Sequence, residues 1–333
     1  MFSHNYHQRN LGSDHFLVTG GAGFIGSNIV EYLLNYGAGK VRVLDNLSTG
    51  LRENYKSFQD NTAFEMLQGD IRDLATCRLA LEGIDYVSHQ AALGSVPRSI
   101  NDPVTTNEVN VNGFLNMMIA SKDAGVKRMV YAASSSTYGD HPHLPKVEDK
   151  IGNPLSPYAV TKYVNELYAE VFSKTYDFHT IGLRYFNVFG PRQNPQGPYT
   201  AVIPVFIQAA LNNQAPFING DGENSRDFTY IENVVQANIR SFFVGDLPKH
   251  EVINIAYGES TTLNQLWKRI NEITGIKLAA NYRADRKGDV KHSLASIDKA
   301  KKLIGYEPKV SVFDGLQLAV EWYKRLPVTV SNS

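Results

Sequence analysis

The sequence contains a single cysteine, Cys77, among its 333 residues. One cysteine cannot form an internal disulfide, so the fold does not depend on an oxidising compartment. Cys77 lies in a stretch that predicts a helix over 74–81, and we expect it to be a buried packing residue. The nine histidines are scattered, and no Cys/His group has the spacing of metal ligands. We therefore predict no metal site.

The chain also lacks a net charge and a long apolar run. Its 33 basic side chains balance 33 acidic ones, which argues against nucleic acid or an anionic membrane as a partner. No apolar run approaches the roughly 20 residues of a membrane span. Residues 1–12 are polar and carry no signal-peptide core, so we expect a flexible tail and a cytoplasmic protein.

Short apolar strands alternate with helical patterns over the first half of the sequence. The six predicted strands span 15–19, 40–45, 64–68, 86–90, 128–133 and 179–185. A further strand over 252–255 could return to the same sheet. Strands that alternate with helices in this way predict an α/β fold with a doubly wound parallel sheet of the Rossmann type.

The first strand leads into glycines spaced G-x-x-G-x-x-G, at Gly20, Gly23 and Gly26, and then into a helical pattern. Such glycines let the backbone approach a pyrophosphate, and the helix N-terminus supplies unpaired N–H groups. The second strand ends at Asp45, roughly 20 residues later, where an acid accepts hydrogen bonds from ribose hydroxyls and disfavours a 2′-phosphate. NAD is therefore predicted over NADP. The predicted NAD-binding residues are Gly20, Gly23, Phe24, Ile25, Gly26, Asp45, Asn46, Ser48, Thr49, Gly50, Asp70, Ile71, Gln90, Ala91, Ala92, Tyr158, Lys162, Tyr185 and Val188.

Ser134, Tyr158 and Lys162 are the predicted catalytic residues. Tyr158 and Lys162 are four residues apart, so in a helix they project from one face. A tyrosine titrates near pH ~10 in isolation, and we expect the lysine ammonium to lower that pKa. A serine at a strand end could relay the proton as hydride leaves or reaches an alcohol carbon. The alternative reading is a solvated helix face beside a polar loop.

After Asn187 the pattern changes, because prolines and glycines interrupt the αβ rhythm. We expect an NAD-binding domain over 13–186 plus about 229–256, and a smaller, discontinuous substrate domain over 187–228 plus 257–330. A local basic cluster lies over 282–293. Such clusters are usually solvated, but Arg226 and Arg286 could each clamp a phosphate.

Together these features make the chain resemble the extended short-chain dehydrogenase/reductase family, and within it the nucleotide-sugar 4-epimerases. The most similar group is the UDP-N-acetylglucosamine 4-epimerases of bacterial surface-polysaccharide synthesis. The stretches that carry the resemblance are 89–99, 131–140, 156–165, 183–190 and 219–222.

The resemblance implies that Ser134 and Tyr158 act on the C4 hydroxyl of a UDP-sugar and that Lys162 holds the nicotinamide ribose. It also implies a homodimer that pairs helices near 107–123 and 158–175. The implied substrate-binding residues are Ser95, Arg98, Ser134, Ser135, Ser136, Asn187, Val202, Ile218, Asn219, Arg226, Arg286, Asp289 and Ser293.

Two positions refine this implied activity. Related dehydratases and decarboxylases carry an extra acid where this chain has Ser135 and Ser136, so elimination is not expected. Relatives restricted to plain hexoses carry a bulky aromatic where this chain has Ser293, and a serine leaves room for an N-acetyl group. The expected activity is UDP-GlcNAc/UDP-GalNAc interconversion through a 4-keto sugar.

Three alternatives stay open. The substrate could be the acidic sugar UDP-N-acetylglucosaminuronate, with Arg98 or a basic loop residue meeting its carboxylate. The enzyme could be a net nucleotide-sugar oxidoreductase. The fold could instead serve as a non-catalytic NAD-sensing scaffold.

Overall fold

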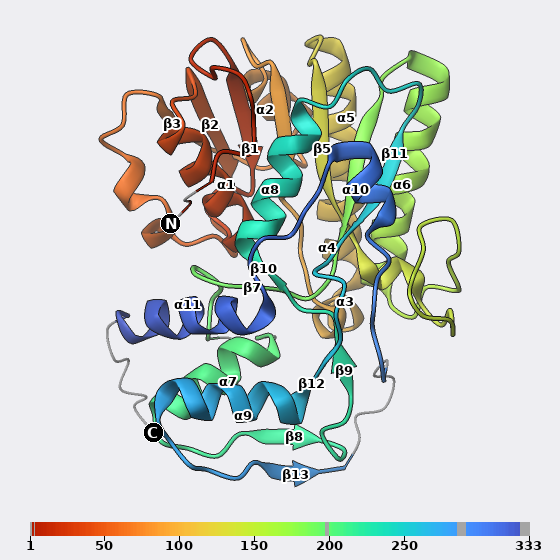
Figure 1. Ribbon diagram of the computed structural model, residues 1–333. Helices are drawn as coiled ribbons and strands as arrows, with labels where there is room; N and C mark the ends of the chain where they lie inside the picture. The colour runs from red at the N-terminus through yellow and green to blue at the C-terminus, as the bar shows by residue number, and fades with distance from the viewer. Residues whose placement is uncertain (1, 3, 197–199, 285–290, 327–333) are drawn as a thin grey trace.

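The centre of the molecule is a sheet of seven parallel strands (Figure 1). The computed structural model describes residues 2, 4–196, 200–284 and 291–326. The strand order is β11–β6–β5–β4–β1–β2–β3. The strands are β1 (His15–Thr19), β2 (Lys40–Asp45), β3 (Phe64–Gln68), β4 (Tyr86–His89), β5 (Arg128–Ser134), β6 (Thr180–Tyr185) and β11 (Glu251–Ile255). This confirms the predicted doubly wound α/β fold, including the returning last strand.

The strand order reverses at β1, which pairs with β2 on one side and with β4 on the other. In open parallel sheets, ligands bind beyond the carboxyl ends of the strands at such a reversal. β1 ends at Thr19, directly before the glycine turn, and β4 ends at His89. The fold therefore brings the glycines and the segment after residue 89 to one edge of the sheet.

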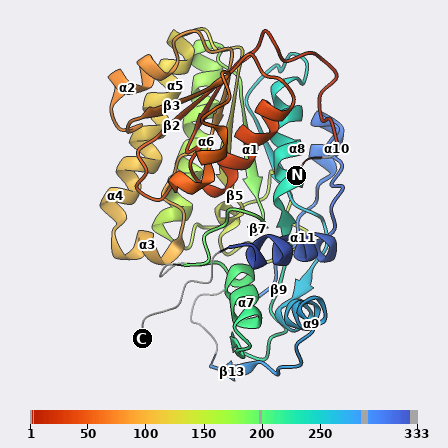
Figure 2. The ribbon, with the colours of Figure 1, turned by 90° about the vertical axis from the view of Figure 1, so that its left-hand side faces the viewer.

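Helices cover both faces of the sheet, as Figure 2 shows from the side. Phe16 and Val18 of β1 belong to a core with α1 (Phe24–Asn35) and α8 (Ile231–Phe242). Leu17 points to the other face, since side chains alternate along a strand. There it joins a core built by α2 (Leu74–Ala80), α5 (Gly113–Asp123) and α6 (Pro157–Tyr176). Cys77 of α2 lies in this second core and is fully buried, as predicted.

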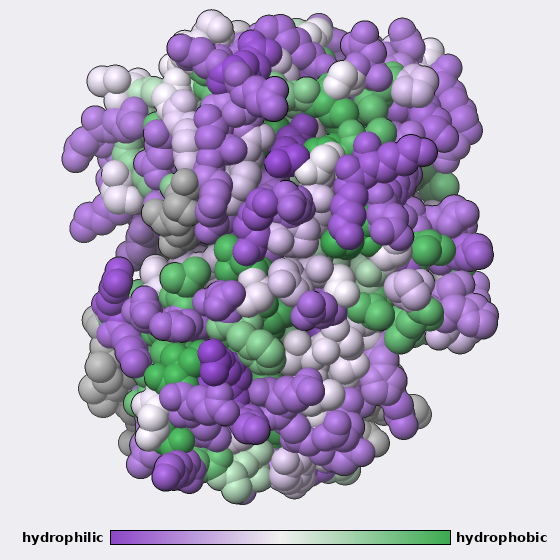
Figure 3. All heavy atoms as spheres, in the orientation of Figure 1, coloured by the Kyte–Doolittle hydropathy of each residue, from purple (hydrophilic) through white to green (hydrophobic). Residues whose placement is uncertain are grey.

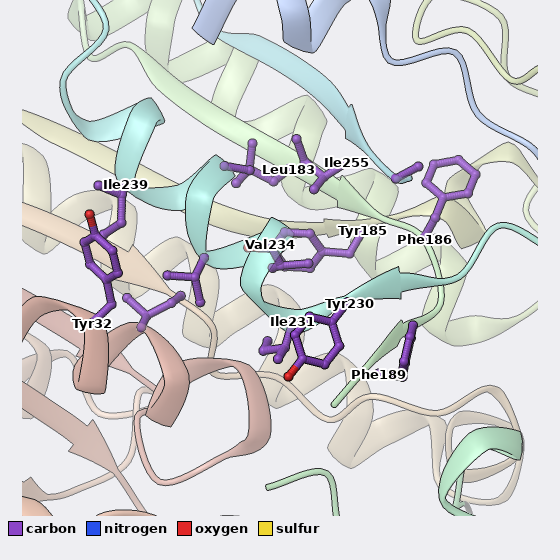
Figure 4. Packing of buried hydrophobic residues seen from close by; sticks show 14 of the residues in the cluster. Tyr32, Leu183, Tyr185, Phe186, Phe189, Tyr230, Ile231, Val234, Ile239 and Ile255 are labelled. Atoms are coloured by element: carbon purple, nitrogen blue, oxygen red, sulfur yellow. The ribbon is translucent and has the colours of Figure 1, made fainter. Parts of the chain in front are cut away.

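Helix α8 is buried almost all round, and Figure 4 shows how its side chains pack with α1 and the sheet. Ile231, Val234 and Ile239 of α8 have no exposed surface. Around them the view shows Tyr32 of α1, Leu183 and Tyr185 of β6, Phe186, Phe189, Tyr230 and Ile255. This close packing fixes α8 between α1 and the sheet.

The predicted helix near 107–123 is divided in the structure. Its parts are α4 (Pro103–Asn107), the π-helical segment η3 (Glu108–Asn112) and α5. Asn110 lies in the π-helical segment, where its amide bonds both backbone groups of Leu93: Leu93 N donates to Oδ1 at 2.8 Å and Nδ2 donates to Leu93 O at 3.2 Å. A π-helical segment of this kind often marks a functional region, and here it supports the loop after β4.

A smaller body lies beyond the carboxyl ends of the central strands (Figure 1). Its helices are α7 (Val202–Leu211), α9 (Leu263–Thr274) and α11 (Val312–Lys324), with β8 (Phe217–Asn219) paired to β13 (Asn281–Arg283). The start of α9 is capped by Thr262 and Gln265. The remaining elements are α3 (Val96–Asn101), α10 (Asp298–Ile304), β7 (Val188–Phe189), β9 (Ser225–Arg226), β10 (Thr229–Tyr230), β12 (Thr261–Thr262), η1 (Arg52–Asn54), η2 (Lys56–Phe58) and η4 (Ser135–Tyr138). We propose the same division as from the sequence, with the substrate domain at 187–228 plus 257–330. Helix α10, which lies in that range, packs instead against β11 and α8 of the sheet body.

The described part of residues 1–12 is not the flexible tail that we expected. Tyr6 is 7% exposed and stacks on Tyr32 of α1, with ring centroids 5.6 Å apart. Its hydroxyl donates to Glu232 of α8 at 2.7 Å, and Leu11 is fully buried. The segment looks polar as a whole, but these two side chains bury enough apolar surface to dock it across α1 and α8.

Hydrophobic side chains gather in separate patches on the face shown in Figure 3, between larger hydrophilic areas. No helix in the described part of the chain is long and apolar enough to cross a membrane.

Candidate active site

The predicted catalytic residues meet where β5 ends and α6 begins. Ser134 is the last residue of β5, and α6 starts at Pro157 with its first turn capped by Ser156, whose Oγ accepts from Ala159 N at 3.1 Å. A proline in the first turn and a serine cap predict this start from the sequence. The cap fixes the helix so that Tyr158 lies in hydrogen-bond contact with Ser134.

Lys162 lies one turn after Tyr158 on the same helix and is 3% exposed. Its Nζ donates to the carbonyl oxygen of Ala132 in β5 at 2.8 Å. The same Nζ lies 5.9 Å from the centroid of the Tyr158 ring. The strand thus fixes the ammonium beside the Tyr158 ring.

The pKa values of these groups differ from our expectation. Burial raises the pKa of Tyr158, and only its hydrogen bond with Ser134 acts in the lowering direction. The expected lowering by Lys162 was wrong for this arrangement, because the ammonium binds a backbone carbonyl rather than the phenol. Burial also lowers the pKa of Lys162 to about 8, while the nearby Glu166 carboxylate acts to raise it.

A cavity of about 490 Å³, here called the serine cavity, opens beside Ser134. Six predicted substrate-binding residues line it: Ser134, Ser135, Ser136, Asn187, Arg226 and Ser293. Ser136 donates to the Ser134 Oγ from both its backbone N–H, at 3.1 Å, and its hydroxyl, at 2.8 Å. The Ser134 hydroxyl is therefore oriented from one side and left to donate on the other.

Ser95 and Arg98 are not among the residues that line the serine cavity. They belong to the start of α3, where the adjoining Val96 and Pro97 do line it. Ser95 caps α3 by accepting from Arg98 N at 3.2 Å, and it has a positive φ of 131°. Such a backbone conformation is costly for a residue with a side chain and is concentrated at functional sites.

A second cavity of about 410 Å³, here called the lower cavity, adjoins the first. Asn187 and Arg226 line both cavities, so these two residues stand at their junction. The lower cavity also contains the predicted residues Val202, Ile218 and Asn219, together with Val188, which we had predicted for NAD. Val188 therefore lies on the side away from the glycine turn.

The glycine turn borders a third cavity of about 440 Å³, here called the glycine groove. Fourteen of the predicted NAD-binding residues line it: Gly20, Gly23, Phe24, Ile25, Gly26, Asp45, Asn46, Ser48, Thr49, Asp70, Ile71, Gln90, Ala91 and Ala92. Gln193 lines both the glycine groove and the lower cavity. Since the lower cavity also shares Asn187 and Arg226 with the serine cavity, it lies between the other two.

Four other predicted NAD contacts do not line the groove: Gly50, Tyr158, Lys162 and Tyr185. Gly50 packs against Ala22 and Asp45, where a Cβ would come within 2.8 Å of Ala22 Cβ. Tyr185 is buried, and its hydroxyl accepts from Asn238 Nδ2 at 2.8 Å and donates to Gln90 Oε1 at 3.3 Å. Tyr185 therefore positions Gln90, which itself lines the groove.

The backbone of the groove fits a dinucleotide. Gly20 has a positive φ of 67°, and a Cβ on Gly26 would lie 2.2 Å from the Gly20 carbonyl oxygen. No side chain caps the N-terminus of α1, so its first N–H groups face the groove without a side-chain acceptor. Asp45 accepts from Ala22 N at 3.0 Å and Leu47 N at 2.8 Å, which holds its carboxylate at the groove wall. These residues would hold the pyrophosphate and ribose of NAD.

Lys146 lines the serine cavity and was not predicted from the sequence, because a lysine in a polar loop gives no signal of burial. His292, which lines the serine cavity, and Arg283, which lines the lower cavity, belong to the basic cluster noted over 282–293. Arg286 and Asp289, predicted to bind UDP, lie outside the described residues. In the described part of the chain, no group of three or more His, Cys, Asp or Glu could hold a metal ion.

The chain is similar to proteins of a known family. The model of the NAD dependent epimerase/dehydratase family matches residues 16–256. A putative UDP-glucose 4-epimerase of Methanocaldococcus jannaschii is 38% identical over 312 residues, which cover 92% of this chain and 98% of that protein.

Solved structures agree with this match. A UDP-N-acetylglucosamine 4-epimerase from Methanobrevibacter ruminantium M1, in complex with UDP-N-acetylmuramic acid, is 40% identical with a TM-score of 0.88; the match covers 93% of this chain and 98% of that one. A UDP-glucuronic acid 4-epimerase from Bacillus cereus, in complex with UDP-glucuronic acid and NAD, is 31% identical with a TM-score of 0.86; the match covers 93% of this chain and 99% of that one.

Proposed function

Because this chain belongs to the NAD dependent epimerase/dehydratase family, we propose that it interconverts UDP-GlcNAc and UDP-GalNAc by inversion at C4. Its coarser activity follows from the comparisons: it is a UDP-sugar 4-epimerase, an isomerase that uses NAD as its cofactor. The observation that carries the catalytic assignment is the position of Ser134 at the wall of the serine cavity, with Tyr158 beside it on α6 and the Lys162 Nζ 5.9 Å from the centre of the Tyr158 ring.

The roles of the chain's own groups follow from this arrangement. The Tyr158 phenolate accepts the proton of the sugar C4 hydroxyl, and the Ser134 hydroxyl donates a hydrogen bond that stabilises the charge on the phenolic oxygen. Lys162, held by Ala132, would hold the nicotinamide ribose of NAD. Bound NAD supplies the acceptor and donor of the C4 hydride, so the reaction has no net redox change. Tyr158 then returns the proton to the inverted alcohol.

Inversion requires the sugar to present its other face while the nucleotide stays bound. Asn187 and Arg226 stand between the serine cavity and the lower cavity, so we assign the diphosphate to this junction and the nucleoside to the lower cavity. A guanidinium is well suited to a phosphate. The serine cavity offers short hydroxyl side chains, which leave a sugar room to rotate.

The choice of an N-acetyl sugar rests on Ser293, which lines the serine cavity. A small side chain there leaves space beside the sugar ring. Among the structures compared, the UDP-N-acetylglucosamine 4-epimerase supports this choice. Other relatives are named as epimerases of UDP-glucose or UDP-glucuronate, so a plain sugar and an acidic sugar are the alternative substrates for this chain.

We further propose that the chain works as a homodimer. Val160, Leu167 and Val171 are 47%, 45% and 53% exposed and recur along one side of α6. A second copy packing its own α6 and α5 on this stripe would cover it. Replacing Leu167 by Glu should then convert the dimer to monomers in sedimentation. A cytoplasmic location and a part in surface-polysaccharide synthesis stay predictions.

One experiment tests the proposed function. The purified protein is mixed, without added cofactor, with UDP-GlcNAc, UDP-Glc or UDP-N-acetylglucosaminuronate, and C4 configuration is followed by NMR. We expect inversion of UDP-GlcNAc and no growth of the reduced-nicotinamide absorbance. Net consumption of added NAD(P)H would indicate an oxidoreductase. Silence on every sugar, with NAD bound, would reject the epimerase and favour the scaffold.

A further inference from the structure

Lys146 lies in the loop between η4 and α6, and its side chain lines the serine cavity. It is 6% exposed, which is unusual for a lysine. Its Nζ donates to the backbone carbonyl oxygen of His141. Among the described residues, no carboxylate forms an ion pair with Lys146. The ammonium of this cavity-lining residue is thus bound to a neutral carbonyl group, that of His141.

The backbone of Lys146 is fixed next to Ser293. Its N–H donates to Leu294 O at 2.8 Å, and Ser296 N donates to its carbonyl oxygen at 2.9 Å. Asn254 Nδ2 donates to the same carbonyl at 3.0 Å. These bonds hold the loop against the segment that follows Ser293, so Lys146 belongs to the rigid wall on the side where we place the sugar substituents.

The charges around the serine cavity are unbalanced. Its described lining contains two permanent cations, Lys146 and Arg226, and no aspartate or glutamate. Arg226 stands at the junction with the lower cavity, where the diphosphate is assigned. Lys146 does not line the lower cavity, so it lies away from the nucleotide. Its charge therefore faces the sugar and not the diphosphate or the nucleoside.

A buried cation without an anionic partner is costly, and a ligand that supplies the anion recovers that cost. Burial alone lowers the pKa of Lys146, with no neighbouring carboxylate to oppose it. A neutral hexosamine offers this ammonium only hydroxyl or amide oxygens. A sugar carboxylate offers a charge-assisted hydrogen bond, which is roughly twice as strong.

We propose that Lys146 is a carboxylate-binding residue of the serine cavity, so that the enzyme also epimerises UDP-N-acetylhexosaminuronates. This inference rests on the proposed function, because it assumes that the sugar occupies the serine cavity. The sequence offered Arg98 or a basic loop residue for this contact, and the structure points to one loop residue, Lys146.

The test compares kcat/KM for UDP-N-acetylglucosaminuronate and for UDP-GlcNAc in the wild type, Lys146→Met and Lys146→Arg. Methionine keeps the aliphatic stem that packs in the wall but removes the charge. In Lys146→Met we expect the ratio of the two values, uronate over neutral sugar, to fall about 10- to 100-fold, as for loss of a hydrogen bond to a charged group. Lys146→Arg should recover part of that ratio.

Lys150→Met is the matched control. Lys150 is an exposed lysine of the same loop and lines none of the three cavities. It removes the same charge from the protein, so its ratio should stay at the wild-type value. A similar fall in Lys150→Met would show a long-range charge effect and overturn the subsite.

Other outcomes separate this proposal from the proposed function. Equal losses on both sugars in Lys146→Met, with a lowered melting temperature, would show that Lys146 only supports the loop and would overturn the inference. Wild-type turnover of UDP-GlcNAc without turnover of the uronate would overturn it as well, while leaving the proposed function intact. Failure of the wild type on both sugars would reject the proposed function itself.

Discussion

Glu166 follows Lys162 by one helical turn on α6, and its carboxylate is bound by Arg184 of β6. The Arg184 Nη2 lies 2.7 Å from Glu166 Oε2, and Nε lies 2.9 Å from Oε1. All three side chains are at least 95% buried. Glu166 is therefore an anion fixed between two cations, one structural and one in the active site.

This arrangement gives Glu166 a part in the protonation of Lys162. His89 on β4 and Tyr158 on α6 also face the ammonium, but burial lowers the pKa of His89 to about 3, so it is neutral. Glu166 is thus the charge that opposes the effect of burial on Lys162. Tyr131 of β5 faces the Glu166–Arg184 pair and stays protonated, because burial raises its pKa.

We predict that Glu166→Gln moves the alkaline limb of the pH–activity profile to lower pH. Lys162 must be protonated to bind the ribose of NAD as a cationic donor, and its pKa of about 8 already lies near neutrality. Loss of the carboxylate lowers that pKa further, so activity falls at a lower pH on the alkaline side. The measurement is kcat/KM against pH from 6 to 10, at a temperature where the variant is folded.

The same change should lower the free energy of unfolding by about 3–5 kcal/mol, because it leaves the buried Arg184 without its partner. Glu170→Gln is the control, since Glu170 is the next residue along this face but pairs with Lys174 at the surface. It should leave the profile in place. An unshifted alkaline limb in folded Glu166→Gln would show that Glu166 has a purely structural role.

We predict that Tyr158→Phe lowers turnover about 10²- to 10⁴-fold, the usual contribution of a positioned acid–base group. The aromatic ring and its packing remain, so bound NAD should be retained. The measurement combines turnover of UDP-GlcNAc with the NAD content of the purified protein. Tyr163→Phe, on the same helix, is the control and should keep normal turnover. Substantial turnover in Tyr158→Phe would remove the phenol from the mechanism.

The parts of the fold that sequence predicted well are those in which local pattern and tertiary environment agree. The β1 strand, the glycine turn and the start of α1 follow one another within 12 residues, and each has a recognisable signature. The sequence also placed Tyr158 and Lys162 on one helix, α6, because residues four apart share a helix face. Their catalytic role, with Ser134, stays a prediction. The fourteen predicted groove residues lie together because each stands at or shortly after the carboxyl end of one of four neighbouring strands, β1, β2, β3 and β4.

The misses depend on contacts between distant segments. The Tyr6 hydroxyl donates to Glu232, 226 residues away in sequence. The residues around Tyr6 give no indication of that partner. Lys146 acquires its place through hydrogen bonds with Leu294, Ser296 and Asn254, all more than 100 residues away in sequence. The pKa of Tyr158 was misjudged because the sequence shows that a lysine is near, but not that Ala132 takes its hydrogen bond. Burial and competing acceptors are properties of the folded chain.

We predict that Gly26→Ala abolishes NAD binding or weakens it severely. Its Cβ would lie 2.2 Å from the Gly20 carbonyl oxygen, and backbone cannot give way as a side-chain end can. Relief would require the glycine turn to move away from the start of α1, which disorders the pyrophosphate site. Isothermal titration with NAD after removal of any bound cofactor measures the effect. Gly245→Ala, which meets no atom within 4 Å, is the control. Normal NAD affinity in Gly26→Ala would contradict this account of the groove.

The last prediction concerns Asp227, which directly follows Arg226 and is completely buried. Its carboxylate accepts backbone N–H groups of Tyr257 at 3.1 Å, Gly258 at 3.2 Å and Ala295 at 3.2 Å. Burial nevertheless dominates and raises the pKa of Asp227 from 3.8 to about 7. The folded state therefore holds a proton that the unfolded chain releases near pH 3.8.

For a carboxyl group with a raised pKa, the stabilising contribution is complete below pH 3.8 and is lost as pH rises toward 7. Asp227→Asn cannot titrate, and its amide N–H₂ faces a backbone donor, so the variant should be less stable at every pH. Its deficit relative to the wild type should shrink between pH 4 and pH 7, because only the wild type loses stability from this group. Urea unfolding of both proteins across that range measures the difference, in which the other titrating groups cancel. A deficit that grows with pH would mean that the three N–H groups outweigh burial and hold Asp227 ionised.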